Sequence, residues 1–225
     1  MRKSLIAGLL ASLAWAGCGG RQQPAEAPRA EPAAQPAPDD RPVIVAFGDS
    51  LTAGMGVDPE SSYPAVLQRE LDGRGFRYRV VNAGISGDTT AGGAARLESI
   101  LAYRPAFVIL ELGANDGLRG LPIETTRENL ERMLVAIEKA GARVVLAGMT
   151  LPPNYGTEYV RSFEQVFIEL ARRHKVPRIS FLLEDVAARP ERMLPDALHP
   201  NAAGHRIVAA NVLRVLEPLL RSARR

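Results

Sequence analysis

The chain has 225 residues, a formal net charge of +3 and ordinary fractions of charged and apolar residues. This length and composition predict one globular domain with short additional segments, and they argue against a disordered chain. The positive charge is not gathered into a dense Lys/Arg cluster with interleaved aromatic residues, so no nucleic-acid partner is expected. The single cysteine excludes an intramolecular disulfide. Three histidines without a Cys-x-x-Cys pair argue against a structural zinc site.

Residues 1–17 are predicted to form an export signal. Two basic residues precede a compact apolar run, Leu5 to Ala16, which is too short to span a bilayer comfortably. The run resembles a bacterial lipoprotein signal, in which Cys18 would be lipidated and become the first residue of the mature chain. Trp15 departs from this pattern, because such signals usually carry an aliphatic residue there. The alternative is an ordinary signal cleaved nearby, which would leave Cys18 removed or free. The lipoprotein interpretation predicts an exported protein, anchored to a bacterial membrane and facing the periplasm or the cell exterior.

Residues 18–41 are predicted to be an unfolded tether. The segment is rich in Pro, Ala, Gln and Glu and has no apolar periodicity, so it cannot bury enough surface to fold. In a polyproline-like state of about 3.1 Å per residue it would extend over several tens of ångströms. We therefore expect it to hold a folded domain, residues 42–221, away from a membrane surface.

The folded part shows the pattern of an α/β domain with a mainly parallel sheet, because apolar runs alternate with amphipathic segments from Pro42 onward. Strands are expected at 43–47, 78–83, 105–112 and 143–149, with a short strand at 178–181. Helices are expected at 63–74, 89–101, 123–140, 157–175 and 201–220.

Three polar, glycine-containing stretches each follow one of the first three strands. They are Gly48-Asp49-Ser50, Gly84-Ile85-Ser86-Gly87-Asp88-Thr89 and Gly113-Ala114-Asn115-Asp116-Gly117. Turn geometry alone would explain each stretch taken singly. In open α/β sheets, however, ligands bind beyond the carboxyl ends of the strands. Parallel strands would bring all three stretches to one edge of the sheet, which predicts a functional site there.

Ser50 is the candidate nucleophile, and a serine needs a base within hydrogen-bond reach. His174 lies among basic residues and is expected at the surface, while His205 on the last helix is expected to take part in packing. His199 has a carboxylate, Asp196, three residues before it in a loop ahead of that helix. An aspartate in that position can fix the imidazole tautomer and stabilise the imidazolium. The alternative is an ordinary polar loop ahead of a capped helix.

Acyl transfer also needs hydrogen-bond donors directed at the developing oxyanion. Gly87 can present a backbone N–H where a side chain would obstruct, Asn115 can add a side-chain N–H, and Ser50 can add its own backbone N–H. A bend at Gly87 and a turn at Asn115 are the structural alternatives.

Taken together, these residues resemble the four sequence blocks of the SGNH (GDSL) hydrolases, in the same order. The blocks are Gly48-Asp49-Ser50-Leu51, Gly87 within Ile-Ser-Gly-Asp-Thr, Gly113-x-Asn115-Asp116 and Asp196-x-x-His199. The segments 82–93 and 115–120 are most similar to the bacterial arylesterase, lysophospholipase L1 and acyl-CoA thioesterase I group.

The resemblance implies a three-layer α/β/α flavodoxin-like sandwich with a mainly parallel sheet, and a site without metal or cofactor. It implies that Ser50 is the nucleophile, His199 the general base and then acid, and Asp196 the carboxylate that orients it. The Ser50 backbone amide, Gly87 and Asn115 would form the oxyanion hole. The implied reaction is hydrolysis of an ester or thioester through an acyl-serine intermediate, with lysophospholipids, aryl esters and acyl thioesters as candidate substrates.

The resemblance also predicts where the substrate lies. A mobile loop at 117–122, which contains Leu118, is expected beside it, and the segment 151–156, with Leu151 and Pro152, is expected to line the acyl crevice. The chain departs from relatives at Ala114, where several have glycine, and at Ala197, where glycine is frequent. Neither departure removes a reacting group.

Two other functions fit parts of the pattern. The same fold could remove O-acetyl groups from carbohydrate, or a non-catalytic surface lipoprotein could bind a ligand at the sheet edge. A binding protein would not need a serine, an Asp–His pair and an asparagine at the same edge.

Overall fold

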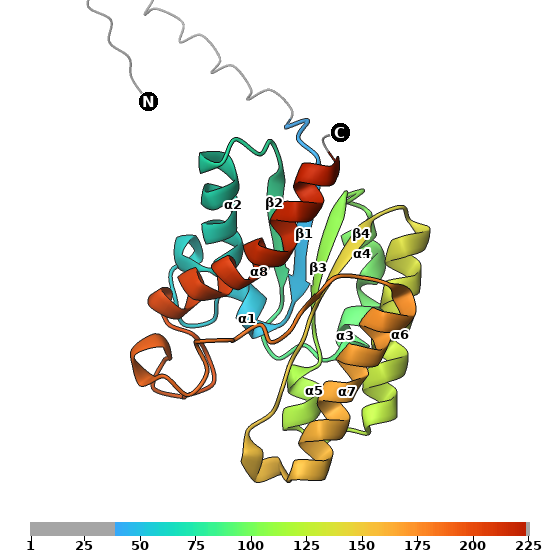
Figure 1. The fold of residues 1–225 in the computed structure, drawn as a ribbon, viewed down its shortest axis with the longest axis vertical. Helices are drawn as coiled ribbons and strands as arrows, with labels where there is room; N and C mark the ends of the chain where they lie inside the picture. Colours follow the sequence, from blue (N-terminus) through green and yellow to red (C-terminus); the bar gives the residue numbers. More distant parts are fainter. Residues whose placement is uncertain (1–38, 224–225) are drawn as a thin grey trace, which may run out of the picture. The chain divides into compact units, whose positions relative to one another are not determined.

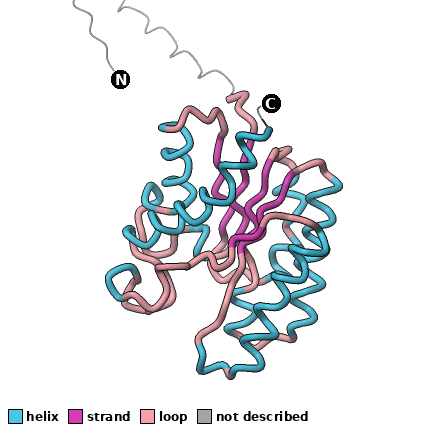
Figure 2. The backbone as a smooth tube through the Cα atoms, in the orientation of Figure 1, coloured by secondary structure: helices cyan, strands magenta, loops and turns pink. Residues whose placement is uncertain are grey.

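A five-stranded parallel sheet forms the centre of the computed structural model, which describes residues 39–223 (Figures 1 and 2). Its strands are β1 Val43–Gly48, β2 Arg79–Gly84, β3 Phe107–Glu111, β4 Arg143–Ala147 and β5 Arg178–Ile179. They lie in the order β2-β1-β3-β4-β5, and each neighbouring pair is parallel. This is the strand order of flavodoxin-like folds. The predicted signal, Cys18 and all of the predicted tether before Asp39 lie outside the described residues.

The central strands β1 and β3 are apolar except for Glu111 at the end of β3, because both faces of these strands are covered. Every residue of β1 and β3 is buried, as expected for parallel strands that carry helices on both faces. The edge strand β2 is only half-buried, and its Asn82 is exposed. The loops that follow β1 and β3 therefore begin in the fully buried centre of the sheet.

Helices cover both faces of the sheet and give three layers (Figure 1). On one face lie α2 Tyr63–Gly73 and α8 Ala202–Ala223, which pack against each other. On the other lie α3 Thr90–Ala95, α4 Leu97–Leu101, α6 Ile123–Lys139 and α7 Thr157–His174. The short helices are α1 Ser50–Ala53, α5 Ala114–Leu118, η1 Pro59–Ser61, η2 Pro153–Tyr155 and η3 Pro190–Arg192. The predicted three-layer α/β/α architecture is confirmed.

The predicted helix at 89–101 was wrong as a single element. The chain forms α3 and α4 instead, and the helix is interrupted at Arg96, whose φ is −104°. Thr89 caps α3, because its side chain accepts a hydrogen bond from Gly92 N. The stretch 113–117, expected to be a loop, contains the short helix α5. The other long elements agree with the predicted bounds to within three residues.

The chain also contributes ordered residues before the first strand. The Arg41 guanidinium pairs with Asp39 at 2.8 Å and donates a hydrogen bond to Tyr78 O at 3.3 Å. Asp39 to Arg41 therefore belong to the folded unit, although they fall inside the predicted tether. Between residues 39 and 223, no helix combines the length and apolar character that a bilayer span requires.

Gly84 is required where β2 passes close to α1, and we predict that Gly84→Ala destabilises the fold. A Cβ at this position would lie 2.1 Å from Ala53 N and 2.7 Å from Ala53 Cα, which are backbone atoms that cannot move independently. Overpacking of this kind costs about 1–3 kcal/mol. Urea unfolding measures the loss.

The control is Gly73→Ala at the end of α2, where nothing lies within 4 Å of the added Cβ. Its free energy of unfolding should rise, by up to about 1 kcal/mol, because alanine favours the helix. Equal stabilities for the two variants would contradict the predicted close approach.

Candidate active site

Ser50 lies at the carboxyl end of β1, as the first residue of α1. Asp49 caps this helix, and its Oδ1 accepts a hydrogen bond from Leu51 N at 3.0 Å. Gly48 lies opposite both Gly84 of β2 and Glu111 of β3 in the sheet register. The three polar stretches therefore leave the sheet side by side, as the sequence pattern predicted.

His199 and Asp196 meet Ser50 from the other end of the chain. The Ser50 Oγ lies 2.9 Å from His199 Nε2, and His199 Nδ1 lies 2.7 Å from Asp196 Oδ2. The other carboxylate oxygen of Asp196 accepts hydrogen bonds from the backbone N–H groups of Leu198 and His199. These two amides, and then the imidazole, lower the pKa of Asp196 to about 2. Asp196 is thus ionised across the neutral range and holds Nδ1 of His199 as the hydrogen-bond donor.

The loop that carries His199 is closed by backbone and amide contacts. Leu194 N donates to His199 O at 2.7 Å, and the Asn201 side chain donates to the carbonyls of Glu191 and Met193. Ala197 has a φ of 56°, which is in the left-handed region. Glycine adopts this conformation without steric cost, which explains why glycine would suit the position.

The backbone N–H groups of Ser50 and Gly87, the predicted oxyanion donors, have no hydrogen-bond acceptor within the described residues. Gly87 has a φ of 80°, and its carbonyl accepts a hydrogen bond from the Arg119 guanidinium at 2.8 Å. Glycine adopts this φ without steric cost. The hydrogen bond from Arg119 fixes the orientation of the peptide group between Gly87 and Asp88.

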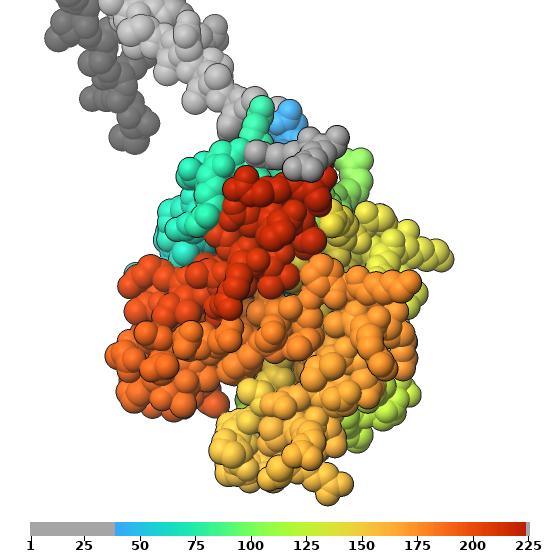
Figure 3. All heavy atoms as spheres, in the orientation of Figure 1, coloured from blue at the N-terminus to red at the C-terminus, as the bar shows by residue number. Residues whose placement is uncertain are grey.

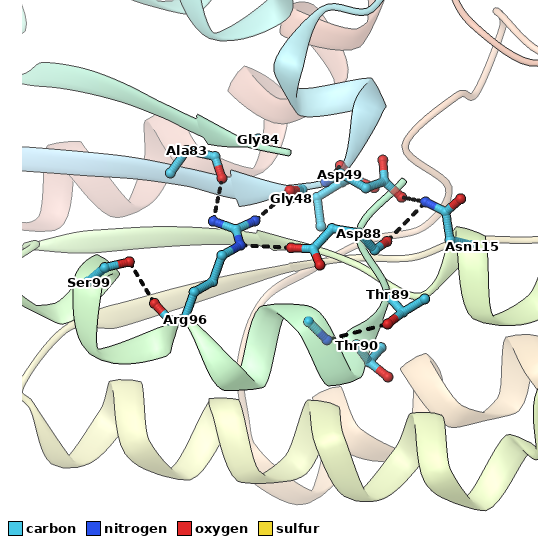
Figure 4. Close-up of polar contacts among 12 residues, drawn as sticks. Gly48, Asp49, Ala83, Gly84, Asp88, Thr89, Thr90, Arg96, Ser99 and Asn115 are labelled. Atoms are coloured by element: carbon cyan, nitrogen blue, oxygen red, sulfur yellow. Dashed lines mark hydrogen bonds and ion pairs between the residues drawn. The ribbon is translucent and has the colours of Figure 1, made fainter. Parts of the chain in front are cut away.

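The Asn115 side chain lies beside Asp49 and Asp88 (Figure 4). Its Nδ2 donates to Asp49 Oδ2 at 3.1 Å and to Asp88 O at 3.0 Å. The two contacts hold the amide nitrogen between the turn that follows β1 and the loop that follows β2.

Arg96 binds the ends of β1 and β2 and the loop that follows β2. The sequence analysis did not recognise this role. Its guanidinium donates to Gly48 O and Ala83 O, both at 2.9 Å, and pairs with Asp88 at 2.7 Å (Figure 4). It also lies over the Phe47 ring, 4.6 Å from the centroid. The interruption between α3 and α4 follows from this side chain, which reaches two strand ends at once. An arginine directly after the small residues 91–95 was the available signal in the sequence.

A second carboxyl group, Glu111, is completely buried beneath the turn that carries Ser50. Its Oε2 accepts from Asp49 N at 3.2 Å and from Thr52 Oγ1 at 2.8 Å. In the described residues its Oε1 has no hydrogen-bond partner. Burial, and then the charge of Asp49, raise the pKa of Glu111 well above its ordinary value, while burial raises the pKa of Asp49 to about 6. Glu111 is therefore the protonated member of the pair. The sequence analysis missed it because it ends an apolar strand.

The two remaining histidines lie away from Ser50 Oγ. His174 was expected at the surface, but its side chain is only 11% exposed, because it packs against Glu138 and Glu131 of α6. His205 is buried in the first turn of α8, as expected for a packing residue, and its Nδ1 accepts a hydrogen bond from Tyr63 N.

The predicted substrate residues have different surroundings. Leu151 is buried, packs against Gly117 and lines a cavity of about 230 Å³. Leu118 is half-buried, and its carbonyl accepts a hydrogen bond from the Tyr155 hydroxyl. Pro152 is exposed. Neither Leu118 nor Pro152 is among the residues that line this cavity.

A second hollow lies beside the loop that carries His199. Its volume is about 330 Å³, and it is lined by Ala188, Arg189, Pro190, Met193, Leu194, Pro195 and Ala197. Figure 3 shows a notch in the molecular surface between the segments coloured for residues near 190 and near 155.

Comparison with known proteins identifies the fold and the chemistry. The family model of GDSL-like lipases and acylhydrolases matches residues 46–207. The chain belongs to this family. It is therefore a serine esterase with the SGNH hydrolase fold, as the resemblance predicted.

Three relatives of the GDSL family cover most of the chain. It is 43% identical to esterase TesA of Pseudomonas aeruginosa over 178 residues, which are 79% of this chain and 89% of TesA. A solved structure of TesA superimposes with a TM-score of 0.77 and 42% identity, covering 79% of this chain and 99% of TesA. An arylesterase of Vibrio mimicus is 40% identical over 77% of this chain and 87% of its own length. The thioesterase 1/protease 1/lysophospholipase L1 of Escherichia coli is 36% identical over 79% and 84%.

We predict that Glu111→Gln stabilises the protein increasingly as pH rises. In the unfolded chain the carboxyl ionises near its ordinary pKa of 4.5, whereas the folded protein keeps it protonated well above that pH. The folded state thus binds the extra proton, and the free energy of unfolding of the wild type falls as pH rises above that value. Glutamine keeps an acceptor for Asp49 N and Thr52 and does not ionise.

Urea unfolding at about pH 5 and about pH 8 measures the effect, because the linkage acts between these values. The stability gained by the variant should be larger at the higher pH. A gain that does not change with pH would contradict the protonated Glu111. Glu158→Gln, on the exposed surface of α7, controls for loss of a carboxyl.

Proposed function

We propose that Ser50, His199 and Asp196 carry out ester hydrolysis through an acyl-serine intermediate. His199 Nε2 accepts the Ser50 proton as Oγ attacks the substrate carbonyl carbon, and Asp196 stabilises the imidazolium that forms. The imidazolium then protonates the leaving group. Water, deprotonated by the same Nε2, attacks the acyl-serine and releases the acid and the free serine. The observation that carries the proposal is the hydrogen-bonded series Ser50–His199–Asp196, with separations of 2.9 and 2.7 Å.

The oxyanion hole in this proposal consists of the backbone N–H groups of Ser50 and Gly87 and the side-chain amide of Asn115. The free state of the two backbone N–H groups in the described structure supports the assignment. Asn115 Nδ2 already has two acceptors, Asp49 Oδ2 and Asp88 O. When the oxyanion forms, one of its N–H groups is shared with the new and more highly charged acceptor.

Esters that carry a hydrophobic acyl chain are the proposed substrate class. Three large apolar side chains on the loops around Ser50 are exposed by about half: Met55, Ile85 and Leu198. Met55 N donates to Ser50 O and Ile85 N donates to Gly48 O, while Leu198 precedes His199. Exposed apolar groups beside the reacting serine favour an acyl chain over an acetylated carbohydrate.

A panel of esters tests the substrate class. Lysophospholipids, aryl esters and acyl thioesters are the substrates proposed, in keeping with the names of the three relatives. Release of fatty acid from esters of increasing acyl length should exceed release of acetate from acetylated polysaccharide. The reverse order would favour the carbohydrate O-acetyl esterase.

Ser50→Ala should abolish turnover of a short p-nitrophenyl ester, because the variant lacks the hydroxyl that is hydrogen-bonded to His199. The far-UV circular dichroism should be unchanged, since the hydroxyl is not part of the sheet or the helices. Undiminished hydrolysis by the folded variant would refute the nucleophile.

Asn115→Ala should lower kcat by about a hundred- to a thousand-fold, the usual effect of removing one oxyanion donor. The effect is read from steady-state kinetics on the same ester. A loss confined to KM would show instead that Asn115 positions the substrate without stabilising the oxyanion.

We also propose that the protein is an exported lipoprotein, anchored through Cys18 with the tether holding the esterase domain off the membrane. The support is the sequence of residues 1–41. In cells fed labelled palmitate, the full chain should carry the label, and Cys18→Ser should abolish the labelling of the protein. Equal labelling of both proteins would exclude Cys18 as the lipidated residue, and a wild type without label would exclude the anchor.

Under this proposal, lysophospholipid in vesicles should be hydrolysed faster than a soluble ester of the same acyl chain, and equal rates would count against a membrane substrate.

A further inference from the structure

A series of buried polar contacts joins the helix that carries Ser50 to the helix that follows His199. Thr52, two residues after Ser50, lies with its Oγ1 3.0 Å from the Tyr63 hydroxyl. The backbone N–H of Tyr63 donates to His205 Nδ1 at 3.2 Å. His205 lies in the first turn of α8, six residues after His199. Thr52, Tyr63 and His205 are each at most 1% exposed.

The direction of each hydrogen bond follows from the chemistry of the groups. Thr52 Oγ1 donates to Glu111 Oε2 at 2.8 Å, so its one proton is used there. The Tyr63 hydroxyl must then donate to Thr52 Oγ1. His205 Nδ1 accepts from a backbone N–H and therefore carries no proton. Burial lowers the pKa of His205 to about 4, which keeps the imidazole neutral in this arrangement.

These contacts form a closed ring with the Ser50–His199 hydrogen bond. One half of the ring is the part-buried contact between Ser50 Oγ and His199 Nε2. The other half runs from Thr52 through Tyr63 to His205 and uses none of the reacting atoms. Because α1 contacts β1 and β2 whereas α8 contacts α2 and β5, this second half is a polar link between the two helices, and it limits how far Ser50 and His199 can separate.

We propose that Thr52, Tyr63 and His205 are positioning residues that set the distance between Ser50 Oγ and His199 Nε2, and that Glu111 anchors the Thr52 end. This inference rests on the proposed roles of Ser50 and His199. Breaking the contact between Thr52 and Tyr63 or the one between Tyr63 and His205 releases the same constraint. The two losses are therefore not independent.

The experiment is a double-mutant cycle on the full chain, with kcat and KM measured on a short p-nitrophenyl ester. Thr52→Val removes the hydroxyl at nearly constant shape, and His205→Leu removes the acceptor. Each should lower kcat about tenfold, as expected for a misplaced nucleophile–base pair, with KM within about twofold of wild type. The double variant should be no slower than the slower single variant, because both break one link.

Conservative variants should restore the rate. Thr52→Ser keeps the hydroxyl, and His205→Asn keeps an acceptor near the position of Nδ1. If His205→Leu does not fold, His205→Phe replaces it in the cycle, since it keeps an aromatic ring but removes the acceptor for Tyr63 N.

Asn211→Leu is the matched control for loss of a buried polar group in α8. Its Nδ2 donates to the carbonyls of Leu182 and Glu184, outside the ring. This variant should lose stability but keep the kcat of the folded enzyme.

Three results would overturn the proposal: unchanged kcat in the single variants, additive losses of about a hundredfold in the double variant, or an equal fall in kcat for Asn211→Leu. Ser50→Ala separates this failure from failure of the proposed function. An inactive Ser50→Ala with unaltered Thr52 and His205 variants refutes only the positioning link, whereas an active Ser50→Ala refutes the catalytic assignment itself.

Discussion

The hydrogen bond between Ser50 and His199 joins residues 149 positions apart, and the fold has to bring them to 2.9 Å. The parallel sheet meets part of this requirement. It gathers the carboxyl ends of β1, β2 and β3 at one edge. The segments that follow these strands carry Ser50, Gly87 and Asn115. The final loop and α8 then return across the face covered by α2 and place His199 over the same edge. The site is therefore a property of strand order, because no pair of neighbouring elements would form it alone.

The polar groups beneath the site come at a cost in stability that the surrounding contacts offset. Glu111 and Asp49 are two buried carboxyl groups, and burying a charge without a partner is strongly unfavourable. Protonation of Glu111 removes one of the charges, and donors from Leu51 and Asn115 stabilise the other. The Arg96 guanidinium, in turn, uses its donors on Asp88 and on two strand-end carbonyls. A network of this kind holds the nucleophile's turn in one conformation, since each group that moves leaves another unsatisfied.

The sequence predicted the fold well, because strands and helices depend on local signals, and signals of the same kind gave the candidate reacting groups. Apolar runs and amphipathic segments located the strands and long helices, and the four family blocks pointed to Ser50, Gly87, Asn115, Asp196 and His199. Glu111, Arg96 and Thr52 were missed because their roles depend on which strands become neighbours. A glutamate at the end of an apolar strand has no local feature that shows what it will contact. The break at Arg96 was missed for the same reason: the helical pattern of 89–101 is continuous, and only the tertiary contacts interrupt it.

Covalent labelling tests the activated serine most directly. The full chain is treated with a fluorophosphonate, digested and analysed by peptide mass spectrometry, with and without prior denaturation. Because the proposed proton transfer from Ser50 to His199 requires the folded site, the label should appear on the peptide that contains Ser50, and only in the native protein. His199→Ala should greatly slow the labelling. Failure of the native protein to react at Ser50, or labelling at another serine with Ser50 unmodified, would contradict the account.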